Sequence, residues 1–285
     1  VAAALEDDVG DVEMRCDELS SRHQFVKYSG TQLLPNGRTV SHFAFVHAVY
    51  QQVLYERVLA SRRVQAHRRI GQRGEELYGE RTSEIAAELS MHFEQAADYR
   101  PAARYLHQAA VNALRRSAYR EAIMLSRRGL ELLARLPDSD GDVRQQLGLQ
   151  ITLGAPLIAT EGYAASEVGS VYLNARELCQ RLEPTPELSQ VLWGLWTFHA
   201  LRAELSTAVG IANEFLQLAE RGTYPGVALR GHWTMQITCT HQGRFRLALN
   251  HFERALSLCG SDQERSDVMG DALDAGVAVR GFAGW

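Results

Sequence analysis

The sequence contains almost no lysine: Lys27 is the only one among 30 basic residues, and all the others are arginine. A Walker A loop, which holds the phosphates of a nucleoside triphosphate, requires Gly-Lys followed by Ser or Thr. Val26 precedes the only lysine. The chain therefore cannot bind a nucleotide through such a loop.

The sequence is also poor in cysteine and lacks a long apolar run. Its four cysteines lie far apart and form no Cys-x-x-Cys pair, which favours reduced core residues over a metal site. No window reaches the roughly 18 uncharged apolar residues of a membrane span, and no secretion signal opens the chain. We therefore expect no contact with a membrane and a cytoplasmic location. The formal net charge of -4 argues against a chain that coats nucleic acid.

What is present is the composition of a core-forming chain: 285 residues, of which 46% are hydrophobic and 22% charged. The sequence begins at Val1 without methionine and ends at Trp285 inside an apolar helical pattern. We expect a fragment of a larger polypeptide.

Small and apolar residues recur at a fixed interval. Val168, Ala208 and Ala248 are spaced 40 residues apart, and each follows a short turn. Because one helical hairpin cannot bury both of its apolar faces, such hairpins stack on one another and share a core. The pattern predicts an all-α, tetratricopeptide-like helical solenoid over 83–285. Its last repeat is truncated, because the helix that begins near Asp267 has no partner before the chain ends.

Two earlier turns, at Asp98-Tyr99 and Ala118-Tyr119, are only 20 residues apart. This shorter step predicts that the helix from about Ala102 to Arg116 serves as the second helix of one repeat and the first helix of the next.

The first eighty residues follow another pattern. A predicted helix over 9–21 is followed by two extended runs on either side of Pro35-Asn36-Gly37, a sequence that accepts the positive φ of a tight hairpin. We interpret 1–60 as a winged-helix end with a β-hairpin wing. Within it a helix over 46–59 is expected, and a connecting helix follows within 61–82.

A run of arginines covers the junction between these last two helices, without one acidic residue. It indicates either a helix that contacts phosphates or a solvated or interdomain face, and the missing aromatic residues favour the second interpretation. The arginines are Arg57, Arg62, Arg63, Arg68, Arg69 and Arg73.

The segment Phe43-Ala44-Phe45-Val46-His47-Ala48-Val49-Tyr50 and the later His67-Arg68-Arg69-Ile70-Gly71 resemble the winged-helix exit of bacterial STAND-class signal-transduction ATPases. The stretches 113–123 and 159–164 resemble the repeat region that follows it, so that the resemblance covers nearly the whole chain. It implies an upstream ATPase domain that binds ATP or ADP with Mg, and an output such as a nucleotide cyclase or a LuxR-type regulator.

His47 takes the position of a histidine that, in this class, contacts the diphosphate of bound ADP within a Met-His-Asp-like motif. Val46 and Ala48 depart from that motif on both sides. The resemblance implies a nucleotide-sensing role for His47. The alternative is a packed histidine on an amphipathic helix, and both interpretations stay open at this point.

Other residues suggest no chemistry. No Gly-x-Ser-x-Gly elbow occurs, and no histidine pair has metal-ligand spacing, so we expect no catalytic residue, metal or cofactor in this chain. The sequence predicts a regulatory module that binds a protein or peptide segment in a concave groove, with an ATPase domain in cis and with self-association left open. The expected groove residues are exposed first-helix positions: Gln190, Arg202, Arg230 and Gln236. The alternatives are an enzyme in which this region only transmits a signal, and DNA binding through the winged helix.

Overall fold

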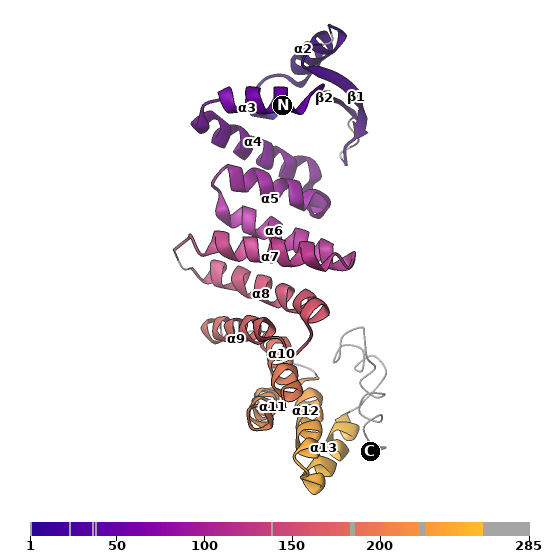
Figure 1. Ribbon diagram of the computed structural model, residues 1–285, viewed down its shortest axis with the longest axis vertical. Helices are drawn as coiled ribbons and strands as arrows, with labels where there is room; N and C mark the ends of the chain where they lie inside the picture. Colours follow the sequence, from indigo (N-terminus) through magenta and orange to yellow (C-terminus); the bar gives the residue numbers. More distant parts are fainter. Residues whose placement is uncertain are drawn as a thin grey trace. The chain divides into compact units, whose positions relative to one another are not determined.

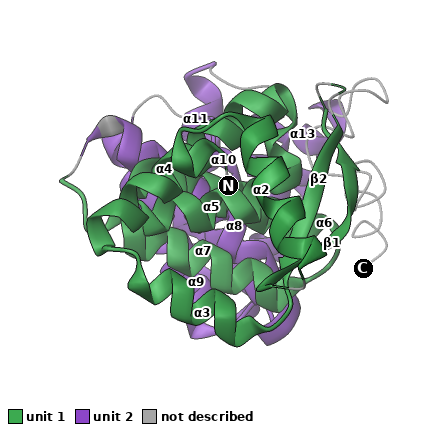
Figure 2. Ribbon diagram, turned by 90° about the horizontal axis from the view of Figure 1, so that it is seen from above, with its two compact units in different colours: residues 1–138 green, residues 139–285 purple. Residues whose placement is uncertain are grey.

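The computed structural model describes residues 2–22, 24–35, 37, 39–137, 139–182, 186–222 and 226–258. Clustering of backbone contacts divides the chain into two compact units, Val1–Asp138 and Ser139–Trp285, which Figure 2 colours separately. This division reflects packing alone, so the domain limits expected at residues 60 and 82 stay predictions.

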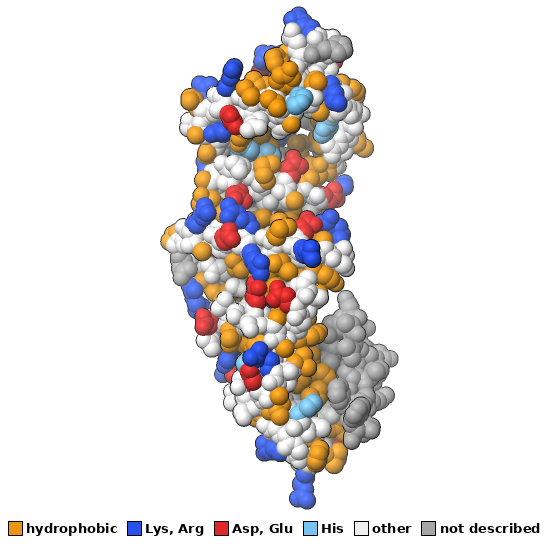
Figure 3. Space-filling model, viewed as in Figure 1, with side chains coloured by type: hydrophobic (Ala, Val, Ile, Leu, Met, Phe, Trp, Pro, Cys, Tyr) orange, Lys and Arg blue, Asp and Glu red, His pale blue; other side chains and the backbone are white. Residues whose placement is uncertain are grey.

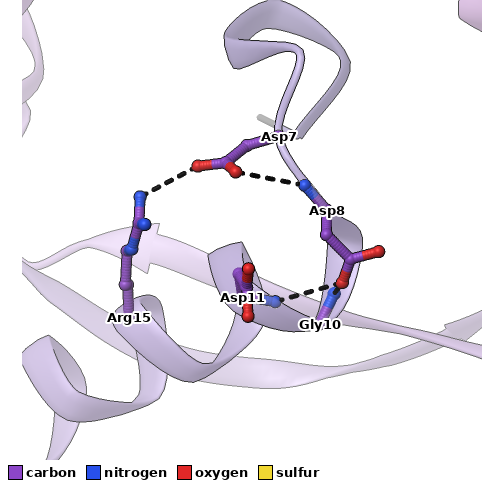
Figure 4. A network of polar contacts seen from close by, with 5 residues as sticks. All are labelled: Asp7, Asp8, Gly10, Asp11 and Arg15. Carbon is purple, nitrogen blue, oxygen red and sulfur yellow. Dashed lines mark hydrogen bonds and ion pairs between the residues drawn. The ribbon is translucent and has the colours of Figure 1, made fainter.

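The first unit begins with α1 (Ala2–Leu5) and α2 (Val9–Ser21), and α2 has the bounds that the sequence predicts. The Asp8 side chain fixes its start by accepting hydrogen bonds from the backbone N–H groups of Gly10 and Asp11 (Figure 4). Asp7 pairs with Arg15, about two turns into the helix, at 2.9 Å. The two contacts of Asp8 satisfy backbone donors that an uncapped helix would leave free.

The predicted β-hairpin is present. Strands β1 (Val26–Leu33) and β2 (Thr39–Phe45) pair antiparallel, from Val26 opposite Phe45 to Leu33 opposite Thr39. A bulge lies between Tyr28 and Gly30, where Gly30 takes a φ of 125°. Asn36 of the expected turn lies outside the described residues.

The remainder of the first unit is helical, and Figure 1 shows α4 to α7 lying one beside the next. Helix α6 packs against both α5 and α7, as the 20-residue step predicts. Its apolar residues join a core with Leu89 and Phe93 of α5 and Leu132 of α7. The elements are α3 (Ala48–Arg57), α4 (Ala60–Tyr78), the 3-10 helix η1 (Gly79–Ile85), α5 (Ala86–Gln95), α6 (Tyr99–Arg115) and α7 (Tyr119–Leu133).

The second unit consists of consecutive helical hairpins. First helices α8, α10 and α12 alternate with second helices α9, α11 and α13, and each helix contacts the next. The three residues that recur every 40 positions, Val168, Ala208 and Ala248, are 5% exposed or less and lie on the second helices. The helices are α8 (Asp140–Glu161), α9 (Ser166–Arg181), α10 (Leu188–Leu201), α11 (Leu205–Glu220), α12 (Val227–His241) and α13 (Phe245–Leu258).

Four hairpins close through the same backbone turn. Ala97, Ser117, Ala203 and Gly243 all have φ between 54° and 71°. The N–H that follows each of them bonds to the carbonyl five residues earlier, as from Glu204 to His199 at 2.9 Å and from Arg244 to Cys239 at 2.9 Å. This is the Schellman arrangement that satisfies the last carbonyls of a helix. Only one of the four positions is glycine, the residue that adopts this φ without strain.

Glycines let the second-unit helices approach closely around Tyr172 of α9. A Cβ at Gly194 of α10 would lie 2.4 Å from the Tyr172 ring, and one at Gly154 of α8 would lie 2.6 Å from its hydroxyl. A side chain at either position would therefore overlap the ring.

The predicted fold class is confirmed: apart from one N-terminal β-hairpin, the described residues form helices arranged as tetratricopeptide-like hairpins. The helix expected near Asp267 lies outside the described residues.

Candidate protein-interaction surface

The first helices α10 and α12 of the second unit contact each other and carry most of the predicted groove residues. Gln190, Trp193 and Thr197 lie three and four positions apart on α10, which places them on one side of that helix. Gln190 is exposed, and Trp193 and Thr197 are half-buried. This side of α10 therefore stays accessible.

Three tryptophans join α10 to α12. The Trp193 and Trp233 rings stack with centroids 5.0 Å apart, and Trp196 lies 5.4 Å from Trp193. The Trp196 indole N–H donates to the Thr238 hydroxyl at 2.9 Å inside the core. Trp196 and Trp233 are buried core residues, whereas Trp193 is half-buried and reaches the surface.

Arg230 of α12 adds a cation to this surface. Its guanidinium carbon lies 5.8 Å from the centre of the Trp193 ring, within the range of a cation–π contact. Burial lowers the pKa of Arg230 below its usual value. The side chain is half-buried rather than fully exposed. We call Gln190, Trp193, Thr197 and Arg230 the tryptophan–arginine face.

Arg202 is exposed, as predicted, but it serves the turn after α10. It donates to the Glu204 carboxylate at 2.8 Å and to the Ala164 carbonyl at 3.2 Å. Hydrogen bonds from Arg202, and then from His199, lower the pKa of Glu204. Arg202 therefore holds the local turn together, and any role in partner binding stays a prediction.

The expected exposure of Gln236 is wrong. The residue is 5% exposed, and its Oε1 has no hydrogen-bond partner among the described residues. The physical reason is that α12 packs against both α11 and α13, so that every residue from Trp233 to Cys239 is buried. A first helix with neighbours on several sides has little surface left for a groove.

His47 lies in the first unit, at the residue that caps α3. Its backbone is extended, and its Nδ1 accepts a hydrogen bond from the Val49 N–H at 3.3 Å. The side chain is exposed. Helix α3 begins two residues later than predicted, so His47 precedes the helix rather than lying on it, and its ring meets that of Tyr50 edge-on with centroids 6.3 Å apart. Contact with an ADP phosphate stays a prediction.

Helix α3 exposes several apolar side chains, which the sequence did not indicate. None of its residues is buried. Figure 3 shows hydrophobic side chains over this end of the first unit. The exposed residues of α3 include Val49, Tyr50, Val53, Leu54 and Tyr55, each at least 40% exposed.

Several members of the arginine run make contacts within the first unit. Arg68 donates to the Ala96 carbonyl at 3.3 Å, Arg69 pairs with Glu6 at 2.7 Å, and Arg73 pairs with Glu76 at 2.7 Å. These contacts support the interpretation of a structural and solvated face over that of a phosphate-contacting helix.

Two histidine pairs are further features that the sequence did not indicate. His67 faces His92, and His232 faces His251, with 2.9 Å between the Nδ1 atoms in each pair. Among the described residues no group of three or more histidine, cysteine, aspartate or glutamate side chains converges. No described helix is long and apolar enough to cross a membrane.

Comparisons with known proteins support the fold and say little about the activity. No protein-family model matches the chain. An uncharacterized protein of Rhizobium meliloti (strain 1021), R02095, is 27% identical over 194 residues. That match covers 65% of this chain, which spans only 19% of the length of R02095.

Among solved structures, the crystal structure of the apo form of RapI is similar, with a TM-score of 0.56 and 11% sequence identity. The similarity covers 83% of this chain and 67% of RapI. At this identity the likeness establishes a shared tetratricopeptide-like helical fold and nothing more. Neither comparison supports the resemblance to STAND-class ATPases.

Proposed function

We propose that this chain is a protein-interaction module and that its tryptophan–arginine face binds a protein or peptide segment. The observation that carries the proposal is Arg230 held over the half-buried Trp193 ring between two first helices. Tryptophan and arginine are the side chains that most often dominate binding energy at protein interfaces. The helical-repeat fold supports the proposal, because stacked hairpins present their first helices side by side.

We further propose that the chain itself performs no catalysis. Its only lysine cannot serve a Walker A loop, and the histidine and carboxylate side chains that the structure describes form no cluster of three or more. Coupling to an ATPase domain in cis, with ATP or ADP and Mg, is a finer proposal that rests on the sequence resemblance alone. A DNA-binding role has less support, because three members of the arginine run make contacts within the first unit.

The test is a selection of peptides from a displayed random library against the whole chain, followed by measurement of affinity for the selected peptides. Arg230→Ala and Gln190→Ala should each weaken binding, by about tenfold for Arg230, which corresponds to roughly 1.4 kcal/mol. Arg246→Ala is the matched control, because Arg246 is an exposed arginine on the second helix α13. The proposal fails if the control weakens binding as much as Arg230→Ala does.

A calorimetric titration with ATP and Mg distinguishes the enzymatic alternative. We expect no heat of binding from this chain. Saturable binding of ATP would instead favour a nucleotide site that the sequence motifs miss. A gel-shift titration with random duplex DNA near physiological salt should likewise show no complex.

A further inference from the structure

A polar cluster links α3, α4 and α5 in the first unit, outside the face described above. His67 of α4 and His92 of α5 approach with their Nδ1 atoms 2.9 Å apart and their ring centres 5.0 Å apart. On the other edge of His67, Nε2 lies 2.9 Å from the Tyr55 hydroxyl of α3. Beyond His92, the Glu88 carboxylate lies 4.0 Å from Nε2.

The two imidazoles are neutral near neutral pH. Burial, reinforced by the neighbouring His67, lowers the pKa of His92 to about 4. Burial also lowers the pKa of His67, and Arg63 adds to that effect. A neutral imidazole keeps one nitrogen lone pair free, which is the form that binds a metal ion.

The separation of the Nδ1 atoms suits two neighbouring ligands of one metal ion. Imidazole nitrogens bind transition metals at about 2.0–2.1 Å. Two such nitrogens lie about 2.9 Å apart when they subtend an angle near 90° at the metal, as in square-planar copper or nickel sites, and about 3.3 Å apart in a tetrahedral zinc site. The observed contact has this length, but it is a hydrogen bond between the two rings, so each ring must turn its lone pair toward an incoming ion.

One of the two outer nitrogens, that of His67, is also placed as such a site requires. When both Nδ1 atoms bind a metal, both protons lie on Nε2, and metal-bound histidines usually donate that proton to an oxygen. For His67 the Tyr55 oxygen is in place, at 2.9 Å. For His92 the Glu88 carboxylate lies at 4.0 Å, beyond hydrogen-bond distance, and its negative charge attracts an incoming cation.

The pair borders an open hollow of about 540 Å³ between α3 and α5. Its wall includes the amide side chains of Gln51, Gln52 and Gln95 and the thioether side chain of Met91. Water or these side chains can complete the coordination. No third histidine, cysteine or carboxylate of the described residues joins the group.

We propose that His67 and His92 form a two-imidazole site for a divalent transition metal ion of the zinc, nickel and copper class, which cross-links α4 to α5. Hard, oxygen-preferring ions such as magnesium and calcium are excluded by the nitrogen ligands. Because the Tyr55 hydroxyl of α3 is hydrogen-bonded to His67, the bound ion also fixes the position of α3 against α4 and α5. The proposal is independent of the tryptophan–arginine face, which lies in the other unit.

The test is a calorimetric titration of the whole chain, without an affinity tag, with zinc and then with nickel. One ion should bind per chain, and its binding should raise the melting temperature until a chelator removes it. His67→Gln and His92→Gln should each abolish both effects. Tyr55→Phe keeps both ligands and removes only the outer oxygen, so affinity should fall by about tenfold or more.

His232→Gln is the matched control. His232 and His251 have the same Nδ1 separation of 2.9 Å, but no oxygen contacts either Nε2 among the described residues. Burial and then Arg254 lower the pKa of His251, as burial and then Arg63 lower that of His67. The two pairs therefore differ in the Tyr55 hydroxyl and the Glu88 carboxylate beside the first pair, and not in a nearby arginine. The control should keep its single ion. No binding to the unchanged chain, binding that persists in folded His92→Gln, or an ion lost in His232→Gln would each overturn the proposal.

Discussion

Replacing Gly194 by alanine tests whether close helix packing holds the second unit together. The new Cβ would lie 2.4 Å from two carbons of the Tyr172 ring. The ring cannot retreat easily, because its hydroxyl lies against Gly154 on the opposite side and the residue is only 6% exposed. Overpacking of this kind costs about 1–3 kcal/mol of stability.

The same substitution at Gly210 of α11 separates this clash from helix propensity. No atom lies within 4 Å of a Cβ built there, and the residue is exposed in a helix interior. Alanine should therefore stabilise the protein at Gly210 by roughly 0.5–1 kcal/mol. Gly194→Ala brings the same gain in helix propensity, but the clash with Tyr172 lowers the stability by about 1–3 kcal/mol. Its free energy of unfolding should therefore lie about 1–3 kcal/mol below that of Gly210→Ala.

Urea unfolding followed by circular dichroism measures this difference, and native-state hydrogen exchange of the α10 amides shows whether the effect is local. We expect the free energy of unfolding to change with opposite signs in the two variants, or to be clearly lower in Gly194→Ala than in Gly210→Ala. If both alanines stabilise the protein equally, then Tyr172 does not pack against the α10 backbone as described, and the account of the close approach is refuted.

Further predictions follow from the turns, the core and the buried histidine. Ala203 and Gly243 both have a left-handed φ, 58° and 71°. In urea unfolding, Ala203→Gly should therefore stabilise the protein by about 0.5–1 kcal/mol, and Gly243→Ala should destabilise it by about 1 kcal/mol. Stability changes of the same sign in the two variants would contradict this reasoning. Phe215→Ala should cost about 3–5 kcal/mol, since the ring is fully buried, and a loss below 1 kcal/mol in the same assay would show a loose core. His92 has a folded pKa of about 4, below the roughly 6.5 of an unfolded chain, so its contribution to stability is complete above pH 6.5 and is lost as the pH falls toward 4. His92→Gln should therefore flatten the dependence of the urea midpoint on pH in this window, and an unchanged slope would count against a buried neutral imidazole.

The repeat could be predicted from the sequence because its determinants are local. A small residue is needed wherever a second helix meets its neighbours, and Val168, Ala208 and Ala248 meet that need at equal spacing. The shared helix α6 follows from the same logic, since two turns 20 residues apart leave room for only one helix between them. Helix periodicity and turn residues are short-range properties.

The surface could be predicted less well, because exposure depends on which neighbours cover a helix. Gln236 and Arg230 occupy the same first helix, yet one is buried and the other is half-buried beside Trp193. His67 and His92 are 25 residues apart, a distance at which sequence spacing carries no information about contact. Their pairing became visible only when α4 and α5 were placed side by side.

The sharing of α6 has a consequence for how the first unit comes apart. A helix that belongs to one hairpin can detach with its partner and leave the next hairpin intact. Helix α6 has no such freedom, because Ala102, Leu106 and Ala109 join residues of α5 and α7 in a single buried cluster. After a protease cut between α6 and α7, we therefore expect the backbone amides of all three helices to lose their protection from hydrogen exchange together. An independently folding fragment should not begin or end within residues 86–133.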